Sequence, residues 1–256
     1  MSELKFSLNR SVLICARRET VFRFFTDSEL FAQWWGPGST IEGRPGGAMK
    51  IIHPNNEKAF GTVLEMEKDK RIVFSFGYDN PAMPVSPEDS RVTVTLEERP
   101  GGTLLTLKHD LASEKVRDHH VQGWRFQLAL FSNVATRVQN TNLTAVLDRY
   151  FSLWGEADGA TRLAGLREVA TPDIVFQDQY SFTTGVEDLD AHLNAARTYM
   201  PGVTLTREGN PRLTHGVALS EWMAKSGDGK VIARGTNAFL LAPDGKLARV
   251  VGFWAG

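Results

Sequence analysis

The strongest constraint on the fold is a series of strand-like segments that ends in one long amphipathic stretch. The strand-like segments lie at residues 47–53, 61–67, 71–77, 91–97 and 103–109, with turn-forming residues between them. From residue 113 to 138, apolar residues recur at intervals of four and three, the period of one helix face. A strand at 4–14 and two short helices at 20–25 and 27–35, the second capped by Asp27, precede the series. The pattern predicts a curved antiparallel sheet that grips one long helix.

A second pattern begins where the sequence turns polar at residues 139–142. We place the boundary there, so that residues 1–139 form one domain and residues 140–256 form another. We expect helices at 143–154 and 161–170, and a third, running to about Met200, that starts at a capping box of Thr184 and Glu187. Strands are expected at 173–178, 203–213, 217–225, 230–241 and 247–254. Helices and strands are segregated along both halves, which predicts the α+β class.

Composition narrows the class of partner. The 256 residues exceed the usual size of one domain, and 29 Lys and Arg against 30 Asp and Glu leave a net charge of -1. A balanced charge gives no field that attracts nucleic acid or an anionic membrane, so we expect neither as a partner. The N-terminus lacks the pattern of an export signal, no apolar run is long enough to span a membrane, and the single Cys15 is expected to be a buried, inert thiol. These features predict a cytoplasmic protein.

The first half resembles the activator of heat-shock protein 90 ATPase family, within the START-like (SRPBCC) helix-grip superfamily. The residues that carry the resemblance cover about 8–138 and include Val21-Phe22, Phe24-Phe25-Thr26-Asp27, Trp34-Trp35-Gly36-Pro37-Gly38, Gly46-Gly47, Gly61-Thr62-Val63, Gly102-Thr103-Leu104-Leu105-Thr106-Leu107 and Gly123-Trp124. The resemblance implies a cup for a hydrophobic ligand. It also implies, by the family's name alone, a co-chaperone role as an activator of an ATPase.

Aromatic residues are the candidates for the lining of this cup: Trp34, Trp35, Phe74, Phe76 and Trp124. The alternative is that they form an ordinary core, because pockets and cores use the same residue types. His109 continues one strand face and is expected either at the rim of the cup or in water at the strand end.

The second half resembles the SnoaL-like polyketide cyclase branch of the nuclear-transport-factor-2-like superfamily. The resemblance covers about 142–254 and rests on Asp148-Arg149-Tyr150-Phe151, Ala157-Asp158, Phe176-Gln177-Asp178, Gly185, Gly235-Thr236-Asn237, Asp244-Gly245-Lys246 and Gly252-Phe253-Trp254. It implies a cone in which helices pack inside a curved mixed sheet. It also implies a homodimer through this half of the chain.

One carboxylate in the second half stands out. Alternation places Ile174, Phe176 and Asp178 on the same strand face, which should meet the core. A carboxylate on an apolar face needs donors or a raised pKa, and a raised pKa suits a general base at neutral pH. Tyr150 lies on an apolar helix face and Asn237 lies in phase with buried positions of a late strand, so the three polar groups are expected to converge.

These positions are similar to those that ketosteroid isomerase fills with a tyrosine, an aspartate base and a second, protonated acid. The resemblance implies that Asp178 abstracts a proton beside a carbonyl while Tyr150 and Asn237 stabilise the enolate. The sequence departs from the isomerase by placing Asn237 where that enzyme has an acid. The alternative is structural: Tyr150 is a core residue, Asp178 caps the following turn, and Asn237 bonds across the sheet.

The sequence therefore predicts a protein that binds a small hydrophobic carbonyl compound of polyketide or steroid type. Phe176 is expected to line the C-terminal cavity, and His192 is expected either to line it or to be a core histidine satisfied by a backbone group. If the protein is an enzyme, we expect isomerase, cyclase or lyase chemistry without a cofactor or metal, because no nucleotide motif or histidine spacing of a metal site occurs. A non-catalytic carrier or sensor with two cups is the alternative, and co-chaperone activity is a second one.

Overall fold

The computed structural model describes residues 3–83 and 85–255. Within it the chain divides into two compact units, Met1–Val138 and Gln139–Gly256. Each unit contains its own sheet and its own helices, so the predicted α+β class is confirmed.

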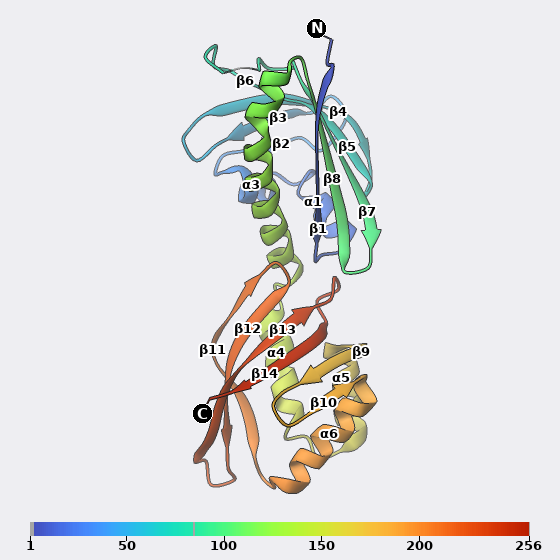
Figure 1. The fold of residues 1–256 in the computed structure, drawn as a ribbon, viewed down its shortest axis with the longest axis vertical. Coiled ribbons are helices and arrows are strands. Elements are labelled where there is room, and N and C mark those ends of the chain that lie inside the picture. The colour runs from blue at the N-terminus through green and yellow to red at the C-terminus, as the bar shows by residue number, and fades with distance from the viewer. Residues whose placement is uncertain (1–2, 84, 256) are drawn as a thin grey trace. The chain divides into compact units, whose positions relative to one another are not determined.

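The N-terminal unit is built on an antiparallel sheet whose strands run in the order β1-β8-β7-β5-β4-β3-β2, with β6 paired to β4 (Figure 1). Its strands are β1 Phe6–Ile14, β2 Thr40–Ile41, β3 Ala48–Ile52, β4 Lys58–Glu67, β5 Arg71–Ser75, β6 Gly77–Tyr78, β7 Arg91–Arg99 and β8 Gly102–Leu111. Its helices are α1 Arg18–Arg23, α2 Ser28–Trp35 and the long α3 Glu114–Gln139, which crosses the sheet in Figure 1.

The predicted grip of sheet on helix is confirmed by this arrangement. The buried face of α3 carries Trp124, Leu128, Phe131 and Ala135 at the predicted spacing. Asp27 caps α2 as expected, because its Oδ1 accepts from the backbone N–H of Glu29 at 2.8 Å. The expected strand at 71–77 is interrupted after Ser75, and β6 pairs with β4 instead of continuing along β7. Cys15 is half-buried rather than buried.

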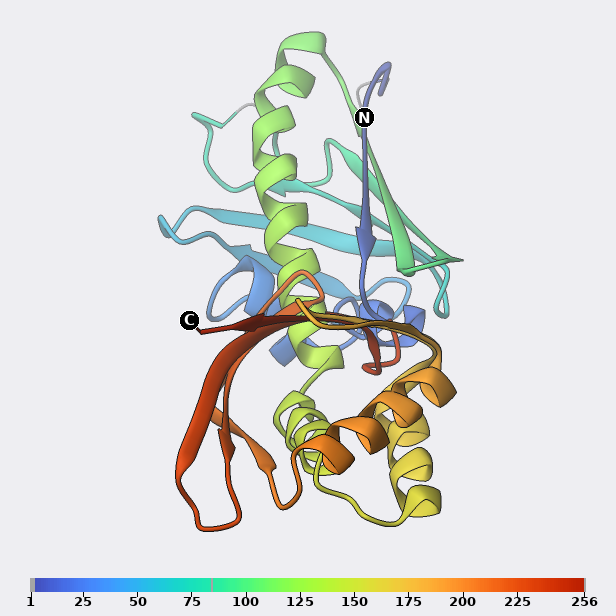
Figure 2. The ribbon, with the colours of Figure 1, turned by 60° about the horizontal axis from the view of Figure 1, so that its bottom comes forward.

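The C-terminal unit wraps a curved sheet around three helices, which lie on one side of the sheet in Figure 2. The strands run in the order β10-β9-β14-β13-β12-β11, and β14 pairs with β9 in parallel, so the sheet is mixed. The helices are α4 Leu143–Leu153, α5 Gly159–Val169 and α6 Val186–Tyr199. The strands are β9 Ala170–Gln177, β10 Phe182–Thr184, β11 Thr204–Thr214, β12 Val217–Lys225, β13 Val231–Leu241 and β14 Leu247–Trp254.

The start of α6 differs from the sequence prediction. Thr184 does not cap the helix, because the N-cap position is Gly185, whose φ of 89° places it in the left-handed region. The side chain of Asp188 instead accepts from the backbone N–H of Thr184 at 3.0 Å. The capping box predicted from Thr184 and Glu187 was therefore wrong, since the reciprocal carboxylate comes from the next residue.

His109 corrects a second expectation, because its side chain is fully buried, neither at a rim nor in water. Its Nδ1 accepts from the indole N–H of Trp124 at 2.9 Å, and its Nε2 lies 2.8 Å from Ser90 Oγ. Ser90 Oγ in turn donates to the carbonyl of Phe76 at 2.6 Å. An indole N–H can only donate, so His109 is neutral with its proton on Nε2. Burial, and then the nearby His120, lower the pKa of His109 to about 3.

No helix in the described part of the chain is long and apolar enough to cross a membrane.

We expect acid to destabilise the N-terminal unit through His109. The unfolded chain takes up this proton near pH 6.5, whereas the folded chain takes it up only near pH 3. Between these values stability falls as the pH falls, at up to about 1.4 kcal/mol per pH unit. Urea unfolding followed by hydrogen exchange of β8 amides measures this slope. His109→Gln should flatten it and His119→Gln, an exposed neighbour on α3, should not; an unchanged slope in His109→Gln would contradict the assignment.

Candidate functional site

The C-terminal unit contains a cavity of about 530 Å³ between α6 and the concave side of the sheet. Most of its lining is apolar, including Trp154, Phe176, Ala196, Leu205, Trp222 and Ile232. Its polar groups come from Asp178, Ser181, His192 and Asn237. A hollow of this size with few polar groups is typical of a site for a small organic molecule.

Asp178 lies at the edge of this cavity, directly after β9, and is half-buried. Its Oδ1 accepts from the backbone N–H groups of Tyr180 and Ser181, both at 2.8 Å. Its Oδ2 accepts from the indole N–H of Trp254 at 3.1 Å. The carboxylate thus caps the following turn, as the structural alternative expected, and also faces the cavity. Because a carboxylate oxygen has two lone pairs, Oδ2 keeps one for a ligand.

Asn237 lies across β14 from Asp178, on β13. Its Oδ1 accepts from the indole N–H of Trp222 at 2.8 Å, a bond that crosses the sheet. The acceptor side of the amide is therefore engaged, and its N–H groups are the polar atoms left to serve a ligand. Trp222 and Trp254 themselves meet edge to face, with ring centroids 5.1 Å apart.

Gly252 allows Asp178 and Asn237 to approach each other. It lies opposite Asn237 in the register of β13 and β14. A Cβ atom there would lie 3.2 Å from Asp178 Cβ and 3.3 Å from Asn237 Oδ1. The absence of a side chain at this position leaves the space in which both polar side chains meet the cavity.

Tyr150 does not join this pair. Its side chain is fully buried beside Phe151 and Phe239, and it is not part of the cavity lining. Burial raises the pKa of its hydroxyl; a contact with the Trp154 side chain opposes this shift, and the charge of Asp178 adds to it. The structure thus places Asp178 and Asn237 in the cavity lining and Tyr150 in the core behind it, close enough for the charge of Asp178 to raise its pKa; the catalytic role of Tyr150 stays a prediction.

His192 and Phe176 both line the cavity. Their rings lie 5.3 Å apart at 30°, and His192 Nδ1 lies 3.3 Å from Ser181 Oγ. Burial lowers the pKa of His192, although Asp178 and Asp188 oppose the shift, so the ring is neutral at neutral pH.

The N-terminal unit has a separate pocket of about 370 Å³ between α3 and the turn that follows β3. Trp35, Phe76 and Trp124 line it, as do His53, Glu57, Tyr78 and His120. Trp34 and Phe74 do not line it, contrary to expectation, because they are buried in the core. Trp34 packs on Phe131 of α3, with ring centroids 4.7 Å apart.

Several residues of both pockets were missed at the sequence level. Trp222 and Trp254 carry the indole donors. Trp222 could have been found from its place on the buried face of β12, where Ala218, Ser220 and Ala224 alternate with exposed and half-buried residues. His53, Tyr78 and His120 lie on three different elements, and no local pattern connects them.

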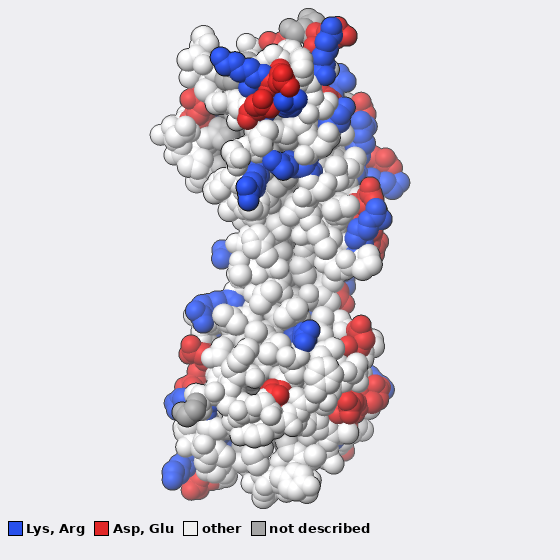
Figure 3. All heavy atoms as spheres, viewed as in Figure 1, with Lys and Arg blue, Asp and Glu red and all other residues white. Residues whose placement is uncertain are grey.

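The surface charge and the possible metal ligands do not point to a particular ligand for either pocket. On the face shown in Figure 3, basic and acidic side chains are intermingled and no large patch of one sign is visible. Within residues 3–83 and 85–255, no group of three or more His, Cys, Asp or Glu side chains could hold a metal ion.

Comparison with known proteins supports one of the two resemblances. Residues 15–135 match the model of the family described as Activator of Hsp90 ATPase homolog 1-like protein, which is somewhat less than half of the chain. The resemblance of the first half to that family is thereby confirmed, whereas the SnoaL-like assignment of the second half stays a prediction. No curated protein is significantly similar to this chain.

Each of the similar solved structures covers about half of this chain. An AHSA1-like protein from Rhizobium etli is 30% identical, with 53% of this chain and 87% of that chain covered and a TM-score of 0.43. A putative isomerase of the SnoaL-like family from Agrobacterium tumefaciens is 25% identical, with 46% of this chain and 99% of that chain covered and a TM-score of 0.43. The Aha1 dimer from Colwellia psychrerythraea is 18% identical, with 48% and 90% covered and a TM-score of 0.42.

We expect Gly252→Ala to disturb the C-terminal site. The new methyl group would press on Asp178 and Asn237, and overpacking of this kind costs about 1–3 kcal/mol. Thermal unfolding should show a lower Tm than the native protein. Gly227→Ala is the matched control, because a Cβ there would meet only the Gly202 carbonyl oxygen, at 3.8 Å. Equal Tm values for the two variants would show that Gly252 does not control the spacing.

Proposed function

We propose that the C-terminal unit binds a small, mostly apolar carbonyl compound and that Asp178 moves a proton next to the carbonyl. The observation that carries the proposal is the meeting of Asp178 and Asn237 on either side of Gly252 in an apolar hollow. A base and a donor that are held in such a hollow suit proton transfer to and from carbon, because charge that develops there is not screened by water.

The two groups have complementary roles in this reaction. Asp178 takes the proton from the carbon beside the carbonyl, and the C–H electron pair becomes the C=C bond of an enolate. The negative charge moves to the carbonyl oxygen, to which the Asn237 amide donates. Return of the proton from Asp178 to the same carbon regenerates the compound, and return to a more distant carbon of a conjugated system isomerises it.

The bonds that fix the two side chains favour these roles. Trp254 and the turn at Tyr180 and Ser181 orient the carboxylate, so little reorganisation is needed when substrate binds. The indole N–H of Trp222 donates to the oxygen of Asn237, which leaves the amide N–H groups as the donors for a ligand. Tyr150 is not needed in this scheme, because its hydroxyl is buried outside the cavity lining.

Deuterium exchange tests the catalytic step. We use 2-tetralone, a bicyclic ketone with exchangeable protons beside its carbonyl, in deuterated buffer and follow the loss of its proton signals by NMR. The protein should accelerate exchange, and Asp178→Asn should lower the acceleration at least about 100-fold. The control is Asp173→Asn, which removes an exposed carboxylate from β9, and it should exchange like the native protein.

A second candidate function is carriage or sensing without chemistry. The specific observation in its favour is that the Asp178 carboxylate already accepts three hydrogen bonds, which is typical of a structural cap. If 2-tetralone binds to the native protein and Asp178→Asn alike, and the two exchange it at the same rate, the site is a binding site and the catalytic proposal is wrong.

The match of residues 15–135 to the Activator of Hsp90 ATPase homolog 1-like family supports a third candidate, a co-chaperone role of the N-terminal unit. A steady-state ATPase assay of a heat-shock protein 90 with and without the full chain tests it. An unchanged rate would remove this candidate.

A further inference from the structure

We propose that the pocket of the N-terminal unit is a binding site for an organic ammonium ion, a protonated primary amine attached to an apolar group. The inference concerns Trp35, Glu57, Tyr78 and His120 and does not depend on any function of the C-terminal cavity.

Aromatic rings form the walls of this pocket. Trp35 and Trp124 meet with ring centroids 5.7 Å apart at 75°, and Phe76 and Tyr78 meet at 5.3 Å and 83°. Phe126, which is 67% exposed, lies at the opening. Aromatic faces attract a cation within about 6 Å of the ring centre, and several rings around one space suit an ammonium group on an apolar body.

The charge of the lining favours a cation. Among the described lining residues, Glu57 is the only carboxylate, and no Lys or Arg lines the pocket. Its carboxylate accepts from the amide of Asn80 at 3.2 Å and forms no ion pair with a described residue. Burial, with a further contribution from Glu57, raises the pKa of Tyr78 to about 12, so the tyrosine stays neutral. A half-buried, unpaired carboxylate beside aromatic rings is a counter-ion for a positive ligand and repels an anionic one.

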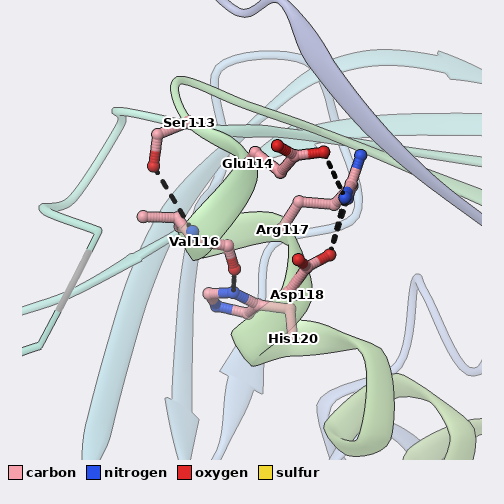
Figure 4. A network of polar contacts seen from close by, with 6 residues as sticks. All are labelled: Ser113, Glu114, Val116, Arg117, Asp118 and His120. Carbon is pink, nitrogen blue, oxygen red and sulfur yellow. Dashed lines mark hydrogen bonds and ion pairs between the residues drawn. The ribbon is translucent and has the colours of Figure 1, made fainter.

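Two histidines supply neutral acceptors. His120 Nδ1 lies 2.8 Å from the carbonyl oxygen of Val116 and donates to it, because a carbonyl can only accept (Figure 4). Neutral His120 therefore carries a lone pair on Nε2, and this atom is buried without a hydrogen-bond partner among the described residues. His120 itself is only 6% exposed. His53 Nε2 is also buried and unpartnered, and the neutral ring offers a lone pair there when its proton is on Nδ1.

The histidines do not oppose a cation. Burial is the main cause that lowers the pKa of each, so both rings are neutral at neutral pH. Tyr78 packs against both rings, with centroids 5.9 Å from His53 and 6.2 Å from His120. An ammonium group has three N–H donors, which is the kind of group that two lone pairs and one carboxylate can satisfy together.

The first turn of α3 holds His120 in place and keeps basic charge away from the pocket. Ser113 Oγ accepts from the backbone N–H of Val116 at 3.3 Å. The guanidinium of Arg117 donates to Glu114 and Asp118 at 2.9 and 2.8 Å, as Figure 4 shows. Its charge is thus balanced on the helix surface, and the carboxylate of Glu57 stays uncompensated.

The C-terminal cavity also has aromatic walls and one carboxylate, but it differs in the state of that carboxylate. Asp178 accepts three N–H donors, whereas the side chain of Glu57 has a single amide donor. Glu57 therefore retains more capacity for a charged donor. This difference is the reason to place the ammonium site in the N-terminal unit.

Three probes with one ring system test the inference on the full chain: 1-naphthylmethylamine, 1-naphthalenemethanol and 1-naphthoate, which are positive, neutral and negative at pH 7. Fluorescence titration should give the tightest binding for the amine and the weakest for the carboxylate. Amide NMR shifts should locate the amine, with a change at Gly123 in the N-terminal pocket and none at Gly252 in the C-terminal one. Equal affinities of the three probes, or shifts at Gly252 alone, would overturn the inference.

A matched pair of variants separates the local carboxylate from net charge. Glu57→Gln should weaken binding of the amine about tenfold and leave the alcohol unchanged, because the amide keeps the bond to Asn80 but loses the charge. Glu98→Gln removes the same charge from an exposed position of β7 and should leave both affinities unchanged. An equal loss in both variants would show a general charge effect, which contradicts a built site. A loss of amine binding in Asp178→Asn alone would move the site to the other unit and contradict it as well.

Discussion

Hydrogen bonds from tryptophan indoles fix polar side chains in both units. Trp124 donates to His109, Trp222 donates to Asn237, and Trp254 donates to Asp178. Because an indole N–H cannot accept, each bond sets the partner's state: a neutral imidazole, an amide with its oxygen engaged, and a carboxylate with one oxygen fixed. The large rings that supply these donors also form apolar surroundings, in which a hydrogen bond is electrostatically stronger than it is in water.

The two pockets use similar rings but different polar chemistry. In the C-terminal unit Asp178 accepts three hydrogen bonds and lies near the Asn237 amide. Side chains that are held in this way suit proton transfer, because they are already oriented. In the N-terminal unit Glu57 is nearly free, and the unpartnered nitrogens of His53 and His120 lie in the same lining. The C-terminal pocket therefore suits the carbonyl compound that we propose for it, and the N-terminal pocket suits the proposed ammonium ion. The difference rests on donors to the carboxylate, since both linings are mostly aromatic and apolar.

Much of the fold could be predicted from the sequence because its long helices and strands have a regular spacing of apolar residues. The stripe of Trp124, Leu128 and Phe131 predicted α3, and the alternating segments predicted the long strands of both sheets. Short elements such as β2, β6 and β10 were not predicted, since two or three residues do not establish a period. The start of α6 was predicted wrongly because the sequence allows a capping box of Thr184 and Glu187. In the structure the N-cap is Gly185, and the carboxylate that accepts from the Thr184 N–H belongs to Asp188. His109 was placed near water because alternation cannot tell whether a helix covers the end of a strand.

By itself the sequence determined the α+β class, the long helix, and the alternation of Ile174 and Phe176 that leads to Asp178 at the end of β9. It also indicated Asn237 as a polar group among buried positions of its strand. Only the tertiary structure decided that these two side chains meet over Gly252 while Tyr150 stays in the core, and that His53, Tyr78 and His120 line one pocket. The physical reason is distance along the chain. Periodicity assigns each residue to a face of its own helix or strand, whereas a site is made by the register and curvature that bring remote faces together.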